Sequence, residues 1–181
     1  TAQLEESFIN LNTGNLNFQN SPTFNNMSSL TVSNGELILE NGATISDSSF
    51  NIDSSIFKPS GSVSVVSNGS LSLNETSSVI LGGNTTLFQS GSVSWPSLDL
   101  NGKALTLDSS VNSMSINGAL NFGIGDTLNS GTSDLSLSTL TIDNGVTFSS
   151  GSGDIQISGA LTLNGELVQG GGILNLISGG T

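Results

Sequence analysis

The chain has 181 residues, a formal net charge of −12, and no Cys or His. These properties exclude disulfides, Cys-ligated zinc and histidine acid–base catalysis. The two basic residues, Lys58 and Lys103, cannot neutralise a row of phosphates, so we expect no nucleic-acid partner. The apolar runs are all far shorter than the roughly 18 residues of a spanning helix, so we expect no membrane insertion.

From Phe8 onward, pairs of apolar residues separated by one polar residue recur along the chain, as in Leu71-Ser72-Leu73 and Leu161-Thr162-Leu163. This period of two places both apolar side chains on one face, which is typical of short β-strands. Clusters of Ser, Asn and Gly separate these segments, and such clusters favour turns.

The predicted strands fall into three sets, and each set recurs about every 21 residues. A repeat of this length predicts a solenoid, in which each three-strand coil stacks on the previous one. The first set begins near Phe8, Leu30, Phe50, Leu71, Val93, Met114, Leu135, Ile155 and Leu174. The second begins near Leu16, Leu37, Ile56, Val79, Leu98, Leu120, Leu140 and Leu161. The third begins near Phe24, Ile45, Val63, Leu87, Leu105, Leu128, Val146 and Leu167.

A glycine follows the second strand of nearly every coil. Asn and Gly tolerate the positive φ that a sharp corner requires, so these glycines are interpreted as structural corners. Asn-Gly pairs also occur in antiparallel hairpins, but a meander needs no register of about 21 residues held across three strand sets. The predicted corner glycines are Gly42, Gly61, Gly83, Gly102, Gly125, Gly145 and Gly165.

The sequence therefore predicts an all-β fold, a parallel β-helix with eight full coils and a partial ninth over residues 8–181. We expect a right-handed coil, because parallel crossovers are nearly always right-handed. The predicted strand starts are also spaced irregularly, from 5 to 9 residues apart, whereas left-handed β-helices have a regular hexapeptide rhythm.

Residues 1–7 precede the first predicted strand and include Glu5 and Glu6. An exposed terminal coil offers unpaired backbone groups that recruit other chains. We therefore predict that residues 1–7 form an N-terminal cap over a single solenoid domain. A cap of this kind predicts that its deletion promotes end-to-end association.

The repeat resembles the right-handed β-helices of secreted bacterial adhesins, both filamentous-haemagglutinin-type proteins and autotransporter passenger domains. Two segments carry the resemblance best, Ile116-Asn117-Gly118-Ala119-Leu120 and Ile157-Ser158-Gly159-Ala160-Leu161. The resemblance covers Phe8 to Leu176. It implies a non-enzymatic structural or adhesive segment at the bacterial cell surface or outside the cell. It also implies a host or neighbouring-cell glycan or protein receptor, and adjoining domains of a longer parent chain.

Two other functions fit the same fold. A viral or phage tail fibre would associate three such rods side by side, and polysaccharide lyases and hydrolases also use β-helices. Those enzymes gather acidic, basic and metal-binding residues on one face. Here Asp99 faces outward with Ile80 and Asn121 on the adjacent coils, and Lys103 at the next corner. We interpret Asp99 as a solvated surface residue, and expect no catalytic residue and no cofactor.

Other candidate sites are weaker. Asp134 and Asp154 precede neighbouring first-set strands, and two stacked carboxylates could hold Ca²⁺, but Ser occupies the same position elsewhere, so no metal site is predicted. Thr141 and Thr162 form a row too short for ice binding. Ile38 and Ile80 offer a weak apolar strip for a neighbouring domain. The resemblance transfers no binding residue, so the receptor-binding residues stay unassigned.

Overall fold

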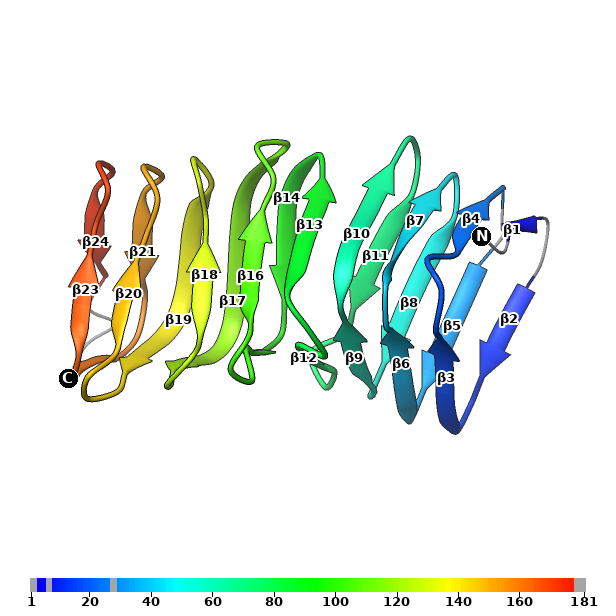
Figure 1. Cartoon of the computed structure of the whole chain (residues 1–181), viewed down its shortest axis with the longest axis horizontal. Helices are drawn as coiled ribbons and strands as arrows, with labels where there is room; N and C mark the ends of the chain where they lie inside the picture. The colour runs from blue at the N-terminus through cyan, green and yellow to red at the C-terminus, as the bar shows by residue number, and fades with distance from the viewer. Residues whose placement is uncertain (1–2, 6–7, 27–28, 178–181) are drawn as a thin grey trace.

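A computed structural model describes residues 3–5, 8–26 and 29–177, with the side chains of 3–5 excepted. It confirms the predicted fold: an all-β parallel solenoid of about eight turns, with ~21 residues per turn. Figure 1 shows a right-handed rod with the two termini at opposite ends. The described residues form no helix that could cross a membrane.

Each coil has three sides, which correspond to the three predicted strand sets. The first side consists of β2 (Phe8–Leu11), β5 (Ser29–Ser33), β8 (Ser49–Asp53), β11 (Ser70–Leu73), β14 (Gly91–Trp95), the first part of β17 (Val111–Phe122), the first part of β19 (Asp134–Ile142), β21 (Ile155–Ile157) and β24 (Leu174–Leu176).

The second side consists of β3 (Gly14–Phe18), β6 (Gly35–Leu39), β9 (Ile56–Pro59), β12 (Ser78–Ile80), β15 (Leu98–Asp99), the second parts of β17 and β19, and β22 (Leu161–Leu163). The third side consists of β1 (Gln3–Glu5), β4 (Thr23–Asn25), β7 (Gly42–Ser46), β10 (Gly61–Val66), β13 (Thr85–Gln89), β16 (Ala104–Leu107), β18 (Thr127–Asn129), β20 (Thr147–Ser149) and β23 (Glu166–Val168).

The core is a single column of apolar side chains inside the rod. It follows from the period of two: in β5, Leu30 and Val32 are buried and Thr31 between them is not. Aromatic rings stack along this column. Phe24 and Phe50 meet edge to face with ring centroids 4.7 Å apart, and Phe122 and Phe148 stack at 4.4 Å. Each such pair adds about 0.5–1.5 kcal/mol to the burial of its rings.

Two of the predicted strand starts were wrong by one residue. Ile9 rather than Phe8 pairs with Leu30, and Phe57 rather than Ile56 pairs with Leu37. A shift of one residue turns the side chain to the other face of the strand. Phe8 is accordingly 77% exposed.

Three third-set positions were wrong by two residues. The observed partners are Ile45 with Val65, Leu87 with Leu107, and Phe148 with Leu167, where Val63, Leu105 and Val146 were predicted. A shift of two keeps the same face inward, so the core pattern alone does not reveal the error. The length of each preceding corner decides between the two registers.

The corner between the first and second sides differs along the rod. In the N-terminal coils it is a turn with a left-handed residue, Asn34 at φ 52° or Ser54 at φ 48°. In β17 the strand continues through this corner with a register irregularity between Ile116 and Ala119. The two segments that resemble bacterial adhesins, residues 116–120 and 157–161, lie at this corner. The first is a bent part of β17, and the second is a short connection between β21 and β22.

The N-terminal segment is described only in part. Residues 3–5 form β1, which pairs in parallel with β4 and so adds one strand to the third side. Residues 1–2 and 6–7 lie outside the described residues. The cap therefore stays a prediction.

Candidate functional site

The predicted corner glycines lie between the second and third sides. Five of them have the expected positive φ, and so the backbone itself requires glycine or a tolerant residue there. They are Gly42 (82°), Gly61 (75°), Gly102 (70°), Gly125 (90°) and Gly145 (76°).

The other two glycines do not have positive φ, which corrects the prediction for Gly83 and Gly165. Close packing requires glycine at position 165 instead, since a Cβ there would lie 2.2 Å from the Val146 carbonyl oxygen. A Cβ at Gly83 would lie 2.2 Å from the Ser60 hydroxyl, a side-chain group that can rotate away. The sequence places a glycine correctly in both corners but does not distinguish these two reasons.

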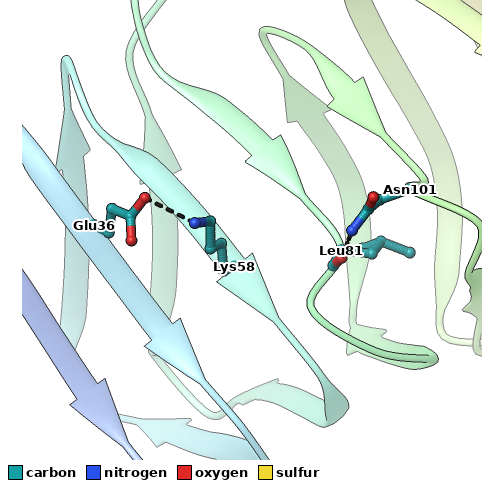
Figure 2. Close-up of polar contacts among 4 residues, drawn as sticks. All are labelled: Glu36, Lys58, Leu81 and Asn101. Atoms are coloured by element: carbon teal, nitrogen blue, oxygen red, sulfur yellow. Dashed lines mark hydrogen bonds and ion pairs between the residues drawn. The ribbon is translucent and has the colours of Figure 1, made fainter.

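Asparagine at these corners also links one coil to the next. Asn101, at φ 53°, and Gly102 form the centre of a turn closed by the Lys103 amide, which donates to the Leu100 carbonyl at 2.9 Å. The Asn101 Nδ2 donates to the Leu81 carbonyl oxygen one coil earlier, at 3.1 Å (Figure 2). In the N-terminal coils Asn41 donates in the same way to the Gln19 carbonyl.

The two carboxylates considered as calcium ligands accept hydrogen bonds from backbone amides instead. Asp134 Oδ1 accepts a hydrogen bond from the Asp154 amide at 2.9 Å, and Asp154 Oδ1 accepts one from the Ile173 amide at 2.7 Å. Each carboxylate thus satisfies an amide of the following coil, where a first-side strand begins. Among the described residues no group of three or more acidic side chains could hold a metal ion.

Asp99 and Lys103 form no ion pair with each other in the part of the chain that is described. Asp99 Oδ1 accepts from the Asn101 amide at 2.8 Å, and so it stabilises the corner. The ion pair of the second side lies elsewhere, between Lys58 Nζ and Glu36 Oε1 at 2.7 Å (Figure 2).

The outward residues of the second side do not form the surfaces considered from the sequence. Strand β9, with Lys58 beside Ile38, lies between the strands that carry Ile38 and Ile80, so a continuous apolar strip is wrong. Thr141 pairs with Thr162 as predicted, and Asn121 precedes them in the row.

The first side carries a shallow groove of about 390 Å³. It crosses β14, β17, β19 and β21 and has two rows of polar side chains. One row is Ser94, Ser115, Ser136 and Gln156, which are paired from strand to strand. The other is Ser92, Ser113, Asp134 and Asp154.

The groove offers hydrogen-bonding groups at strand spacing, about 4.8 Å. Ser113 Oγ donates to Ser92 Oγ at 2.9 Å, and Ser94, Ser115 and Ser136 of the other row carry outward hydroxyls on adjacent strands. A hydroxyl both donates and accepts, and an ionised carboxylate only accepts. The groove therefore combines rows of hydrogen-bonding groups, negative at Asp134 and Asp154, with apolar lining that includes Met114.

One carboxyl outside the groove has a shifted pKa. The pKa of Asp108 is lowered, chiefly by hydrogen bonds from the backbone and side chain of Ser110. The Ser110 amide donates to Asp108 Oδ1 at 2.9 Å, in a turn that leads into β17. This shift reflects the turn that Asp108 forms with Ser110.

A set of buried serines at the corners was not predicted from the sequence. Ser55 Oγ accepts from the Gly35 amide at 3.0 Å, and Ser77 Oγ accepts from the Ser55 amide at 3.3 Å. Ser133 Oγ donates to the Val111 carbonyl at 2.6 Å. Serine is abundant throughout this chain, so composition hides these positions. Their recurrence one coil apart was the signal that could have revealed them.

Comparison of the chain with protein-family models, with curated proteins and with solved structures found no match in any of the three. A function for this chain therefore has to be inferred from its fold and from the geometry of its outer surface.

Proposed function

We propose that this chain is a non-enzymatic attachment segment of a secreted bacterial surface protein, and that the first-side groove binds a neutral glycan. The main observation that supports this proposal is the groove, in which two rows of polar side chains cross four strands. The adhesin resemblance supports secretion and a location at the cell surface. The rest of the rod serves as the stalk that presents this surface.

A neutral glycan suits the chemistry of the groove better than an anionic one. Rows of hydroxyls, with Gln156 at the end of one row, match the repeated hydroxyls of a sugar chain. Asp134 and Asp154 and the net charge of −12 repel acidic polysaccharides and nucleic acids. Their carboxylates accept hydrogen bonds from sugar hydroxyls without needing a cation.

Binding to immobilised glycans tests the proposal. The panel contains neutral and acidic polysaccharides, and the variant is Ser115→Arg, which places a long side chain in the middle of the groove. The control is Thr106→Arg on β16 of the third side, which makes the same charge change at a half-buried outward position.

We expect the parent and Thr106→Arg to bind a neutral glycan, and Ser115→Arg to bind it at least about tenfold more weakly, or about 1.4 kcal/mol. Equal binding by both variants would remove the groove from the proposal. If the chain binds no glycan and binds an immobilised protein receptor instead, the ligand class is wrong. Release of reducing sugar from any polysaccharide would favour the enzyme alternative.

A further inference from the structure

The first side of the rod has an opening in its interior, between β11 and β14. Strand β11 pairs with β8 and β14 pairs with β17, but among the described strands β11 and β14 do not pair with each other (Figure 1). The other two sides continue past this point, from β9 through β12 to β15 and from β10 through β13 to β16. The opening is therefore confined to one side of an otherwise continuous rod.

Strand β11 directs free backbone groups into this opening. On its other edge, the Ser70 and Asn74 amides donate to carbonyls of the preceding coil at 2.9 and 3.1 Å. Successive residues of a strand direct their backbone groups to opposite edges, so the amides and carbonyls of Leu71 and Leu73 point into the opening. Within the described part of the chain, these groups of Leu71 and Leu73 have no backbone partner.

Strand β14 presents a matching edge from the opposite side. The Gly91 amide donates to the Ser110 carbonyl at 3.1 Å, toward the β17 side of the strand. The backbone groups of Ser92 and Ser94 therefore point toward β11, and no backbone group among the described residues pairs with them. Two edges with unused donors and acceptors thus lie on either side of the opening.

The opening also leaves two core positions partly uncovered. Leu71 and Leu73 are the inward residues of β11, but both are only half-buried. The inward residues of the strands on either side are almost fully buried, as in Ile52 of β8 at 1% exposed and Val93 of β14 at 3%. An occupant of the opening would therefore cover apolar surface as well as pair with backbone groups.

A hollow of about 270 Å³ lies where the chain enters β11 and β14. Its lining includes Val66 and Gly69, which precede β11, and Gln89 and Ser90, which precede β14. Phe88 supplies a second apolar wall beside Val66. The hollow can therefore take an apolar side chain of a segment that leads into the opening.

Carboxylates lie at both ends of β11. Asn68, just before the strand, donates to Asp47 Oδ1 at 2.8 Å, and Asn74, just after it, donates to Asp53 Oδ1. The only two basic residues of the chain both lie away from the first side. Charge complementarity therefore favours an occupant with a basic residue at each end.

We propose that the opening binds one extended peptide strand of a partner protein, which pairs in parallel with β11 at one edge and with β14 at the other. Its alternate apolar residues cover Leu71 and Leu73, and Lys or Arg residues flank them. A glycan or lipid would leave most of the edge amides and carbonyls without partners, whereas a peptide strand supplies both. This site uses the backbone edge of β14 and is distinct from the side-chain rows proposed to bind a glycan.

Amide hydrogen exchange, followed by NMR for each residue, tests the opening in the free chain. The amides of Leu71, Leu73, Ser92 and Ser94 should exchange at least about tenfold faster than the amide of Leu135, which is hydrogen-bonded in a paired part of the same side. Exchange of all four amides as slow as that of Leu135 would mean that β11 and β14 pair directly, and would overturn the proposal.

A fluorescent peptide that contains Lys-Val-Thr-Val-Lys is the probe for binding. Fluorescence polarisation should show saturable binding, and the bound peptide should slow exchange of the four amides at least about tenfold. One control peptide has the order Lys-Val-Val-Thr-Lys, which breaks the apolar alternation at constant charge. The other is N-methylated at the threonine, which removes a donor to β11. Both should bind at least about tenfold more weakly. Absence of binding by the probe, or equal binding by either control, would overturn the proposal.

Variants of the chain place the site on the rod. Leu71→Lys puts a cation in the opening and should weaken peptide binding at least about tenfold. Ile124→Lys makes the same charge change at a lateral corner, where Ile124 is 91% exposed, and should leave binding unchanged. Asp53→Asn keeps the shape of the side chain and should weaken binding about threefold at low salt, which tests the site even if Leu71→Lys does not fold. Parent affinity in Asp53→Asn, or equal losses in Leu71→Lys and Ile124→Lys, would contradict the proposed site.

Discussion

The corners at Gly42 and Gly145 look alike in sequence, since both are Asn-Gly pairs between a second-side and a third-side strand. Both glycines have positive φ, 82° and 76°. Their surroundings differ. A Cβ at Gly42 would lie 2.0 Å from the Ser62 carbonyl oxygen, whereas nothing lies within 4 Å of one at Gly145. One motif therefore serves a tightly stacked corner in the N-terminal coils and an open corner in the C-terminal coils.

The difference shows that the glycine column has two separate physical causes. Backbone conformation favours glycine or a tolerant residue such as Asn where φ is positive, and stacking requires glycine where the backbone of a neighbouring coil approaches the Cα. Gly42 meets both conditions, Gly145 meets the first, and Gly165 meets the second. Substitutions at these corners should separate the two contributions.

The largest effect is expected for Gly42→Val. Valine at position 42 would be held at an unfavourable positive φ. Its side chain would also overlap the Ser62 backbone, which cannot move without disturbing the ladder between β7 and β10. We expect a loss of about 4 kcal/mol in the free energy of unfolding, or failure to fold. Urea unfolding followed by circular dichroism measures it. A loss no greater than that of Gly145→Val would contradict the distinction between the two corners.

Gly145→Val should destabilise the rod by about 1–2 kcal/mol, because strain in φ is then the main contribution. The control is Ser136→Thr at an exposed outward position of β19, where a β-branched residue suits a strand. That control should change stability by less than about 0.5 kcal/mol. Identical urea midpoints for Gly145→Val and the parent would mean that positive φ is not limiting at this corner.

Asp126→Ala should have a smaller effect, about 1 kcal/mol. Its carboxylate accepts from the Gly102 amide at 2.7 Å and from the Gly123 amide at 2.8 Å, and so it joins two successive corners. Asp126→Asn keeps one carbonyl acceptor and should be intermediate. Equal urea midpoints for the alanine variant and the parent would show that water replaces the carboxylate at no cost.

Deamidation of the Asn-Gly pairs should have the smallest effect on stability, and its rate should distinguish one corner from another. Cyclisation requires the amide nitrogen of the following glycine to attack the Asn side-chain carbonyl carbon, with loss of ammonia and then addition of water. At Asn101 the side chain is bonded to Leu81 and the Gly102 amide to Asp126. All four residues of the two corners are exposed, but in the described part of the chain neither the Asn144 side chain nor the Gly145 amide has such a bond. Peptide mapping by mass spectrometry after mild alkaline incubation should therefore find conversion of Asn144 to be much faster than that of Asn101. Equal rates would contradict the rigidity inferred for the Asn101 corner.

The sequence alone determined the strand type, the three-sided coil and the repeat of about 21 residues, because a period of two within a longer period leaves few other ways to bury the apolar residues. It also located the corner glycines. The tertiary structure decided the register, since slips of two residues, as at Val63 and Val65, keep the same face buried.

Only the tertiary structure brought the groove together. Ser94, Ser115 and Ser136 are unremarkable in a serine-rich chain, and they form one surface because stacking places them on adjacent strands. It also decided which Asn-Gly corners are tightly packed. Those properties depend on contacts with the neighbouring coil, about 21 residues away in the sequence. The local sequence pattern does not show how closely two neighbouring coils approach each other.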